Sequence, residues 1–191
     1  MQLDLLAIAA HPDDVELTCG GTMIKAARLG RRTGIIDLTE GEMGTRGTIT
    51  DRRREAAAAA RILGVTHREN LGLPDAHLEL RMDYKLALAR RIRALRPRTV
   101  ILPYWEGRHP DHYTGAKLGY EACFLAGLKQ LDIEGEAFRP FKILYATSYD
   151  FTVRPSFVVD ISKEYARRMR AIMAYATQFR PRTRDRKSKV H

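Results

Sequence analysis

Short apolar runs that alternate with segments of helical periodicity are the feature that most constrains the fold of this chain. The runs are too short for helices and rich in aliphatic side chains, which predicts strands at residues 3–9, 33–39, 65–71, 99–102, 143–147 and 157–161. Apolar residues at helical spacing predict helices at residues 17–29, 51–63, 83–95, 113–128 and 163–175. The alternation predicts an α/β fold, a Rossmann-like three-layer sandwich around a mostly parallel sheet.

Length and composition predict one globular domain. A chain of 191 residues with 45% hydrophobic residues is close to the size of one domain and can bury a substantial core. Thr50 or Asp51 is expected to cap the helix at 51–63, and Gly64 to end it. The apolar runs are far shorter than the roughly 18 residues that a membrane helix needs.

Targeting signals and cysteine usage point to a reducing compartment. The first residues lack the basic region that begins a signal peptide. Cys19 and Cys123 form neither a disulfide framework nor a redox pair of the CxxC type. We therefore expect a cytoplasmic protein with no membrane partner.

The positive charge is concentrated at the end of the chain. The formal net charge is +10, and residues 180–191 alone hold six basic residues and one acidic residue. We expect a single domain at residues 1–179 and a basic, disordered tail at residues 180–191. A solvated tail is favoured over a nucleic-acid contact, because the rest of the chain carries only the other half of the charge.

Two loops that follow apolar runs hold the residues best suited to chemistry. They read His-Pro-Asp-Asp at residues 11–14 and His-Pro-Asp-His at residues 109–112. Loops at the carboxyl ends of parallel strands form the binding crevice of such a sheet. Two imidazoles and a carboxylate are a ligand set of catalytic zinc, and Fe²⁺ would also fit it. Either tetrapeptide alone could be a helix-capping turn, but the pair favours a metal site.

These paired loops resemble those of the PIG-L/LmbE-like zinc-dependent de-N-acetylases, which remove acetyl from N-acetylglucosamine-type substrates. The similarity extends to residues 37–44, to Arg52 with Glu55, and to residues 70–75 and 174–179. It covers about residues 3–179, and within the family it is greatest to the bacillithiol-biosynthesis deacetylase type.

The resemblance implies a role for each candidate site residue. The implied ligands of Zn²⁺, or of Fe²⁺, are His11, Asp14 and His112. The implied catalytic residues are Asp13 as general base, His109 as the group that stabilises the oxyanion and protonates the leaving amine, and Asp111 as its orienting partner. We expect the Asp111 carboxylate to raise the pKa of His109 and so to keep it charged.

The resemblance also places Glu42 and Arg52 near the substrate. Glu42 could accept hydrogen bonds from sugar hydroxyls, and Arg52 could pair with a carboxylate such as a malyl group. An ion pair between Arg52 and Glu55, three residues apart on one helix, is the competing interpretation. Tyr104 and Trp105 are expected to be packing residues more than sugar-stacking platforms.

These expectations combine into a function. The chain is predicted to be a metal-dependent hydrolase that removes the N-acetyl group from an N-acetylglucosamine-type conjugate, such as the GlcNAc-malate precursor of bacillithiol, and releases acetate and a free amine. Its expected partner is a small amino-sugar substrate, and a homo-oligomer is compatible with the sequence. The alternative is an inactive or truncated remnant that binds an acidic partner through its basic tail.

Overall fold

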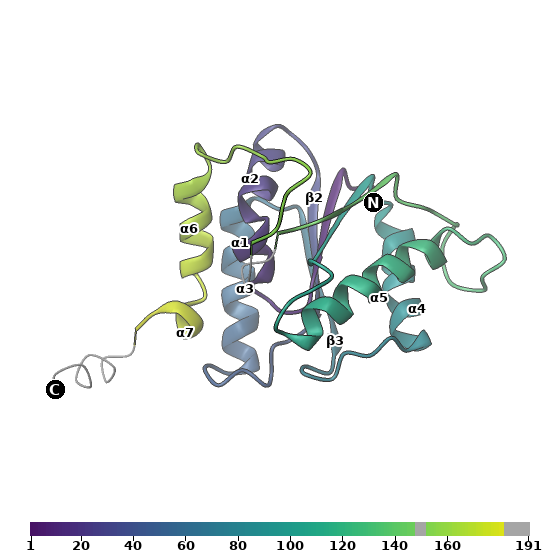
Figure 1. The fold of residues 1–191 in the computed structure, drawn as a ribbon, viewed down its shortest axis with the longest axis horizontal. Coiled ribbons are helices and arrows are strands. Elements are labelled where there is room, and N and C mark those ends of the chain that lie inside the picture. The colour runs from purple at the N-terminus through teal and green to yellow at the C-terminus, as the bar shows by residue number, and fades with distance from the viewer. Residues whose placement is uncertain (148–151, 182–191) are drawn as a thin grey trace.

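The computed structural model describes residues 1–147 and 152–181, and within them one parallel sheet organises the chain (Figure 1). The strand order is β3-β2-β1-β4-β5, and every neighbouring pair is parallel. The strands are β1 (Leu5–Ala9), β2 (Thr33–Thr39), β3 (His67–Leu73), β4 (Thr99–Leu102) and β5 (Lys142–Tyr145). The predicted Rossmann-like α/β fold is confirmed, and this sheet is entirely parallel.

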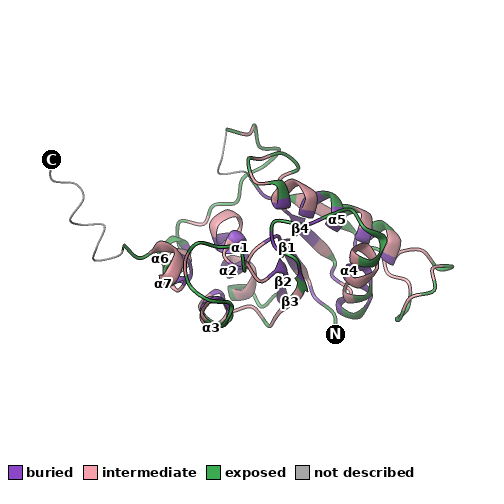
Figure 2. Ribbon diagram, turned by 90° about the horizontal axis from the view of Figure 1, so that it is seen from below, coloured by how far each residue is buried: buried purple, intermediate pink, exposed green. Residues whose placement is uncertain are grey.

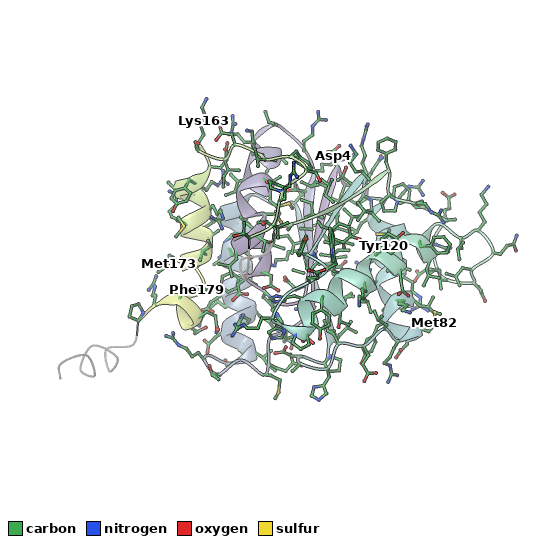
Figure 3. All side chains as sticks on the ribbon, in the orientation of Figure 1. Asp4, Met82, Tyr120, Lys163, Met173 and Phe179 are labelled. Carbon is green, nitrogen blue, oxygen red and sulfur yellow. The ribbon has the colours of Figure 1, made fainter. Side chains whose placement is uncertain are left out.

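Helices cover both faces of the sheet. They are α1 (Asp14–Thr18), α2 (Gly20–Arg28), α3 (Ile49–Leu63), α4 (Met82–Leu95), α5 (Pro110–Ala126), α6 (Tyr165–Met173) and α7 (Ala176–Phe179). The α4 and α5 helices pack together on one face, and α1, α2 and α3 cover the other (Figures 1 and 2). The α6 helix packs against α2 and α3, on their side away from the sheet. Met82 at the start of α4 and Phe179 at the end of α7 therefore lie toward opposite ends of the molecule (Figure 3).

The alternation of side chains along β1 explains the two core layers. Leu6 and Ile8 belong to the apolar cluster shared with α4 and α5, whereas Ala7 and Ala9 belong to the cluster on the opposite face. Successive residues of a strand point to opposite faces, so a continuous apolar run supplies both layers. Figure 2 shows the resulting burial of the central strands.

One predicted strand is wrong. Residues 157–161 form no strand, and Phe157 and Val158 are 60% and 80% exposed. An apolar run becomes a strand only where a neighbouring strand accepts and donates its backbone hydrogen bonds. Residues 182–191 of the predicted basic tail lie outside the described residues.

Helix boundaries differ from the predictions in detail. Thr48, and neither Thr50 nor Asp51, caps α3: its hydroxyl accepts from the Asp51 N–H, and Asp51 accepts from the Thr48 N–H. The predicted helix at 17–29 is divided into α1 and α2 at Cys19. The predicted helix at 163–175 is shorter in the structure, where α6 begins at Tyr165 and ends at Met173. None of the helices in the described parts of the chain has the length and apolarity needed to cross a membrane.

A buried ion network ties α1 to the sheet. Arg68 of β3 donates to Glu16 Oε1 at 2.7 Å and to both carboxylate oxygens of Asp37, at 2.8 and 3.0 Å. Tyr175 also donates to Glu16, at 3.1 Å. Burial raises the pKa of the Glu16 carboxyl, while Arg68 opposes that rise. Glu16 lies two residues after Asp14, so this network anchors the helix that begins at the first histidine-aspartate loop.

Candidate metal centre and active site

The two histidine-aspartate loops meet at the carboxyl edge of the sheet, as predicted. The first leaves β1 and leads into α1, and the second follows β4 and leads into α5. β1 and β4 are neighbours, whereas the chain passes from β1 to β2 on the other side. The loops therefore flank the point where the strand order reverses, which is where ligands bind in open α/β sheets.

All three predicted ligands converge there. One donor atom from each of His11, Asp14 and His112 lies within 4.8 Å of the other two. His11 Nδ1 is 3.3 Å from Asp14 Oδ2, and His112 Nε2 is 3.2 Å from Asp14 Oδ1. Burial would raise the pKa of Asp14, but hydrogen bonds with the two imidazoles hold it well below its usual value. An ionised carboxylate between two imidazoles fits a tetrahedral divalent cation with one open position.

The other nitrogen of His11 is held by two further carboxylates. His11 Nε2 is 2.9 Å from Asp75 Oδ1 and 3.4 Å from Asp111 Oδ2. Burial alone would lower the pKa of His11, but the carboxylates of Asp111, Asp14 and Asp75 raise it to about 12. A carboxylate behind a histidine ligand orients the ring and fixes which nitrogen faces the metal. This arrangement directs Nδ1 toward Asp14.

Asp75 is a site residue that sequence reasoning missed. Its carboxylate also accepts from the Met43 N–H at 2.8 Å, and its own N–H donates to Glu42 Oε1 at 2.8 Å. It thus connects the loops that follow β1, β2 and β3. The signals for it were its place just after a predicted strand and its position within residues 70–75, a segment that carries the family resemblance.

Asp13 has an environment unlike that of its neighbour Asp14. Its backbone adopts φ 119°, a left-handed conformation that non-glycine residues rarely occupy. Burial, and then the charge of Asp14, raise the pKa of the Asp13 carboxyl well above its usual value, while Arg52 lowers it. Adjacent carboxylates with pKa values pushed apart suit different tasks, one as a ligand and one as a proton acceptor.

Arg52 is buried against the first loop. Its Nη1 donates to the Pro12 carbonyl at 2.8 Å and to Asp13 Oδ2 at 3.1 Å. Glu55, the partner in the competing interpretation, instead accepts from the Thr177 N–H and hydroxyl, each at 2.8 Å. Arg52 and Glu42 both have partners within the protein, and their contacts with a substrate stay a prediction.

His109 and Asp111 are oriented differently from the prediction. The Asp111 N–H donates to His109 Nδ1 at 3.2 Å, whereas the Asp111 carboxylate accepts from the N–H groups of Ala76 and Leu78 and faces His11. The pKa of His109 is lowered, by burial first and then by His11 and His112, despite the opposing charge of Asp111. Asp111 acts in the predicted direction, but the net pKa of His109 is lowered, so the expectation that His109 stays charged is wrong. The pKa of His109 falls because burial and the positive charges of His11 and His112 outweigh the negative charge of Asp111.

Tyr104 and Trp105 pack against other aromatic rings, but Trp105 is 44% exposed, and the expected packing role of the two residues stays a prediction. Their rings stack with centroids 4.2 Å apart, and Trp105 meets Tyr145 edge to face at 4.8 Å. Cys123 is buried in the core, and Cys19 and Cys123 are both free thiols.

Fold and site together define a class of protein: a parallel α/β sandwich whose β1 and β4 loops gather a His-Asp-His group beside a second aspartate. The model of the PIG-L family, GlcNAc-PI de-N-acetylase, matches residues 6–123. The chain belongs to this family.

Named relatives agree with that assignment. The chain is 32% identical to diacetylchitobiose deacetylase of Thermococcus kodakarensis, over 92% of this chain and 70% of that protein. It is 26% identical to a probable N-acetyl-alpha-D-glucosaminyl L-malate deacetylase 2 of Bacillus anthracis, over 92% and 81% of the two chains. The crystal structure of the conserved protein TT1542 from Thermus thermophilus superposes with a TM-score of 0.90 and 46% identity, over 93% and 80%.

Proposed function

We propose that this protein is a metal-dependent deacetylase that hydrolyses the N-acetyl group of an N-acetylglucosamine-type conjugate. The observation that carries the proposal is the convergence of His11, Asp14 and His112, with Asp13 beside them. Relatives named for diacetylchitobiose and for N-acetylglucosaminyl malate support a GlcNAc-type substrate. The GlcNAc-malate precursor of bacillithiol is the particular substrate we favour, Zn²⁺ the metal, and the cytoplasm the location.

The chemistry requires an activated water, a polarised carbonyl and a proton for the leaving amine. A zinc ion held by His11, Asp14 and His112 would supply a Lewis acid for the carbonyl and lower the pKa of the attacking water. Asp13 accepts the proton of that water, because its raised pKa makes it a stronger base than an exposed aspartate.

His109 faces the reaction with its other nitrogen. Since Nδ1 accepts from the Asp111 N–H, the neutral ring carries its proton on Nε2, which can donate to the developing oxyanion. The lowered pKa keeps His109 neutral at neutral pH. We therefore assign delivery of a proton to the amine to Asp13, which returns the proton that it took from water. After each turnover Asp13 and His109 are back in their starting protonation states.

The test measures bound zinc and acetate release together. The full chain is purified, its zinc content determined, and acetate release followed with N-acetylglucosaminyl malate and with diacetylchitobiose. We expect about one zinc per chain, release of acetate, and loss of activity in chelator that added zinc restores. A zinc-loaded, folded protein that releases acetate from neither conjugate would contradict the proposal.

A further inference from the structure

A cavity opens beside the metal-ligand group, in the crevice between the carboxyl ends of β1 and β4. Its cavity volume is about 30 Å³, which is room for about two water-sized groups. Asp14 and His112 form part of its wall, so the cavity lies directly next to the atoms that would hold the metal. Nothing in the reaction described above uses this space.

The inner wall of the cavity is apolar. It includes Ala9, Val15, Ile101 and Ala146, which are between 2% and 9% exposed. Cys19 also lines it, and burial raises the pKa of its thiol to about 12, so the thiol stays uncharged and acts as a small apolar group. A sugar placed against this wall would leave hydroxyl groups without hydrogen-bond partners, which is costly.

Besides the metal ligands, the polar lining residues are Thr18, Tyr104, Glu106 and Thr147. The Tyr104 ring stacks on Trp105, and Thr147 is exposed. The Thr18 hydroxyl donates to the Asp14 carbonyl at 2.8 Å. Glu106 is exposed and marks the mouth of the cavity. The space between is suited to a short hydrocarbon group.

The arrangement of the reacting amide indicates which group that is. An amide carbon bears an oxygen, the leaving nitrogen and the carbon of its acyl chain. In the proposed reaction the oxygen lies between the metal ligands and His109 Nε2, and the nitrogen lies on the side of Asp13. Among the described residues, the lining of the cavity includes Asp14 and His112 but neither Asp13 nor His109. The third substituent is the one left to point into the cavity.

We propose that this cavity is the subsite for the acyl chain of the substrate, and that Ala146 and Cys19 set the length of chain it accepts. The inference rests on the proposed function and extends it from the sugar to the acyl group. It makes the enzyme a hydrolase of short N-acyl groups, propionyl as well as acetyl.

The experiment compares N-acetyl, N-propionyl and N-butyryl forms of one glucosamine conjugate, with kcat/KM measured for each. The ratios between substrates are compared, because metal occupancy affects all substrates of one protein sample equally. One methylene more or less in an apolar pocket changes kcat/KM by about 10- to 200-fold. Ala146→Leu fills the cavity and should lower the propionyl-to-acetyl ratio by about tenfold or more. Cys19→Ala enlarges it and should raise the butyryl-to-acetyl ratio by about tenfold.

Ala57→Leu is the matched control, because Ala57 is exposed on α3, outside the cavity. Its ratios should equal those of the wild type. Zinc content and thermal unfolding are measured for every variant. If Ala146→Leu does not fold, the acyl ratios of Cys19→Ala test the subsite alone, since this substitution removes an atom and cannot clash.

The outcomes separate the two proposals. Release of acetate with acyl ratios that are unchanged in the folded, zinc-loaded variants would overturn the acyl subsite and leave the deacetylase function standing. A wild-type protein that holds zinc and releases no acid from any conjugate would overturn the function itself, and the subsite with it. A lower propionyl-to-acetyl ratio in Ala146→Leu together with a higher butyryl-to-acetyl ratio in Cys19→Ala would support both the deacetylase function and the acyl subsite.

Discussion

Replacing Arg68 with methionine should destabilise the whole fold through two buried carboxylates. Methionine keeps the length of the side chain and removes its charge. The Glu16 and Asp37 side chains, 0% and 3% exposed, then lose the donor that binds them both. Removing one partner of a buried ion pair costs about 3–5 kcal/mol. For a chain of this size, 1 kcal/mol corresponds to a shift in Tm of about 2–4 °C, so Tm should fall by roughly 6–20 °C.

The assay is urea and thermal unfolding followed by circular dichroism, with Arg54→Met as the matched control. Arg54 pairs with Asp51 on the surface of α3, where its side chain is 73% exposed. An exposed pair of this kind contributes about 0–1 kcal/mol, so the control should unfold almost as the wild type does. A loss below about 1 kcal/mol in Arg68→Met would refute the claim that this arginine neutralises buried charge.

The pH dependence separates lost charge from lost packing. Burial already raises the pKa of Glu16 with Arg68 present, and removing Arg68 removes the opposing effect. The folded variant then binds a proton that the unfolded chain has released, so its stability falls as pH rises through that interval. The destabilisation should be larger near pH 8 than near pH 5. An equal loss at both values would assign the effect to packing.

The remaining predictions concern the site. Asp13→Asn should keep its zinc and lower acetate release by about 100-fold or more, because the base is lost while the ligands remain; loss of zinc would make Asp13 a ligand. The wild-type kcat/KM should rise with pH through the raised pKa of Asp13, and a pH profile that is flat there would contradict the base role. His109→Gln should lower kcat by about 10²- to 10³-fold with zinc retained, as expected for one lost oxyanion donor. Asp75→Asn should weaken zinc binding by about 10- to 100-fold in competition with a chelator; unchanged affinity would show that Asp75 does not orient His11.

The sequence by itself predicted the five strands of the sheet and the edge at which the candidate metal ligands lie. Aliphatic runs such as residues 99–102 predict strands because burial on both faces leaves no polar position. The alternation of strands and helices places both histidine-aspartate motifs at the carboxyl edge of the sheet, and the pairing of β1 with β4 then brings them together. His11, Asp14 and His112 converge for that reason.

Only the tertiary structure decided which groups surround those motifs. Asp75 reaches His11 across 64 positions of sequence, and Arg52 reaches Asp13 across 39. No local pattern encodes such pairs, because they depend on how helices and loops pack over the sheet. The same reason explains why Asp111 turns its carboxylate to His11 and why residues 157–161, though apolar, form no strand. Hydrophobic periodicity is a property of neighbours along the chain, whereas a hydrogen-bond partner or a pairing strand is supplied by a distant segment.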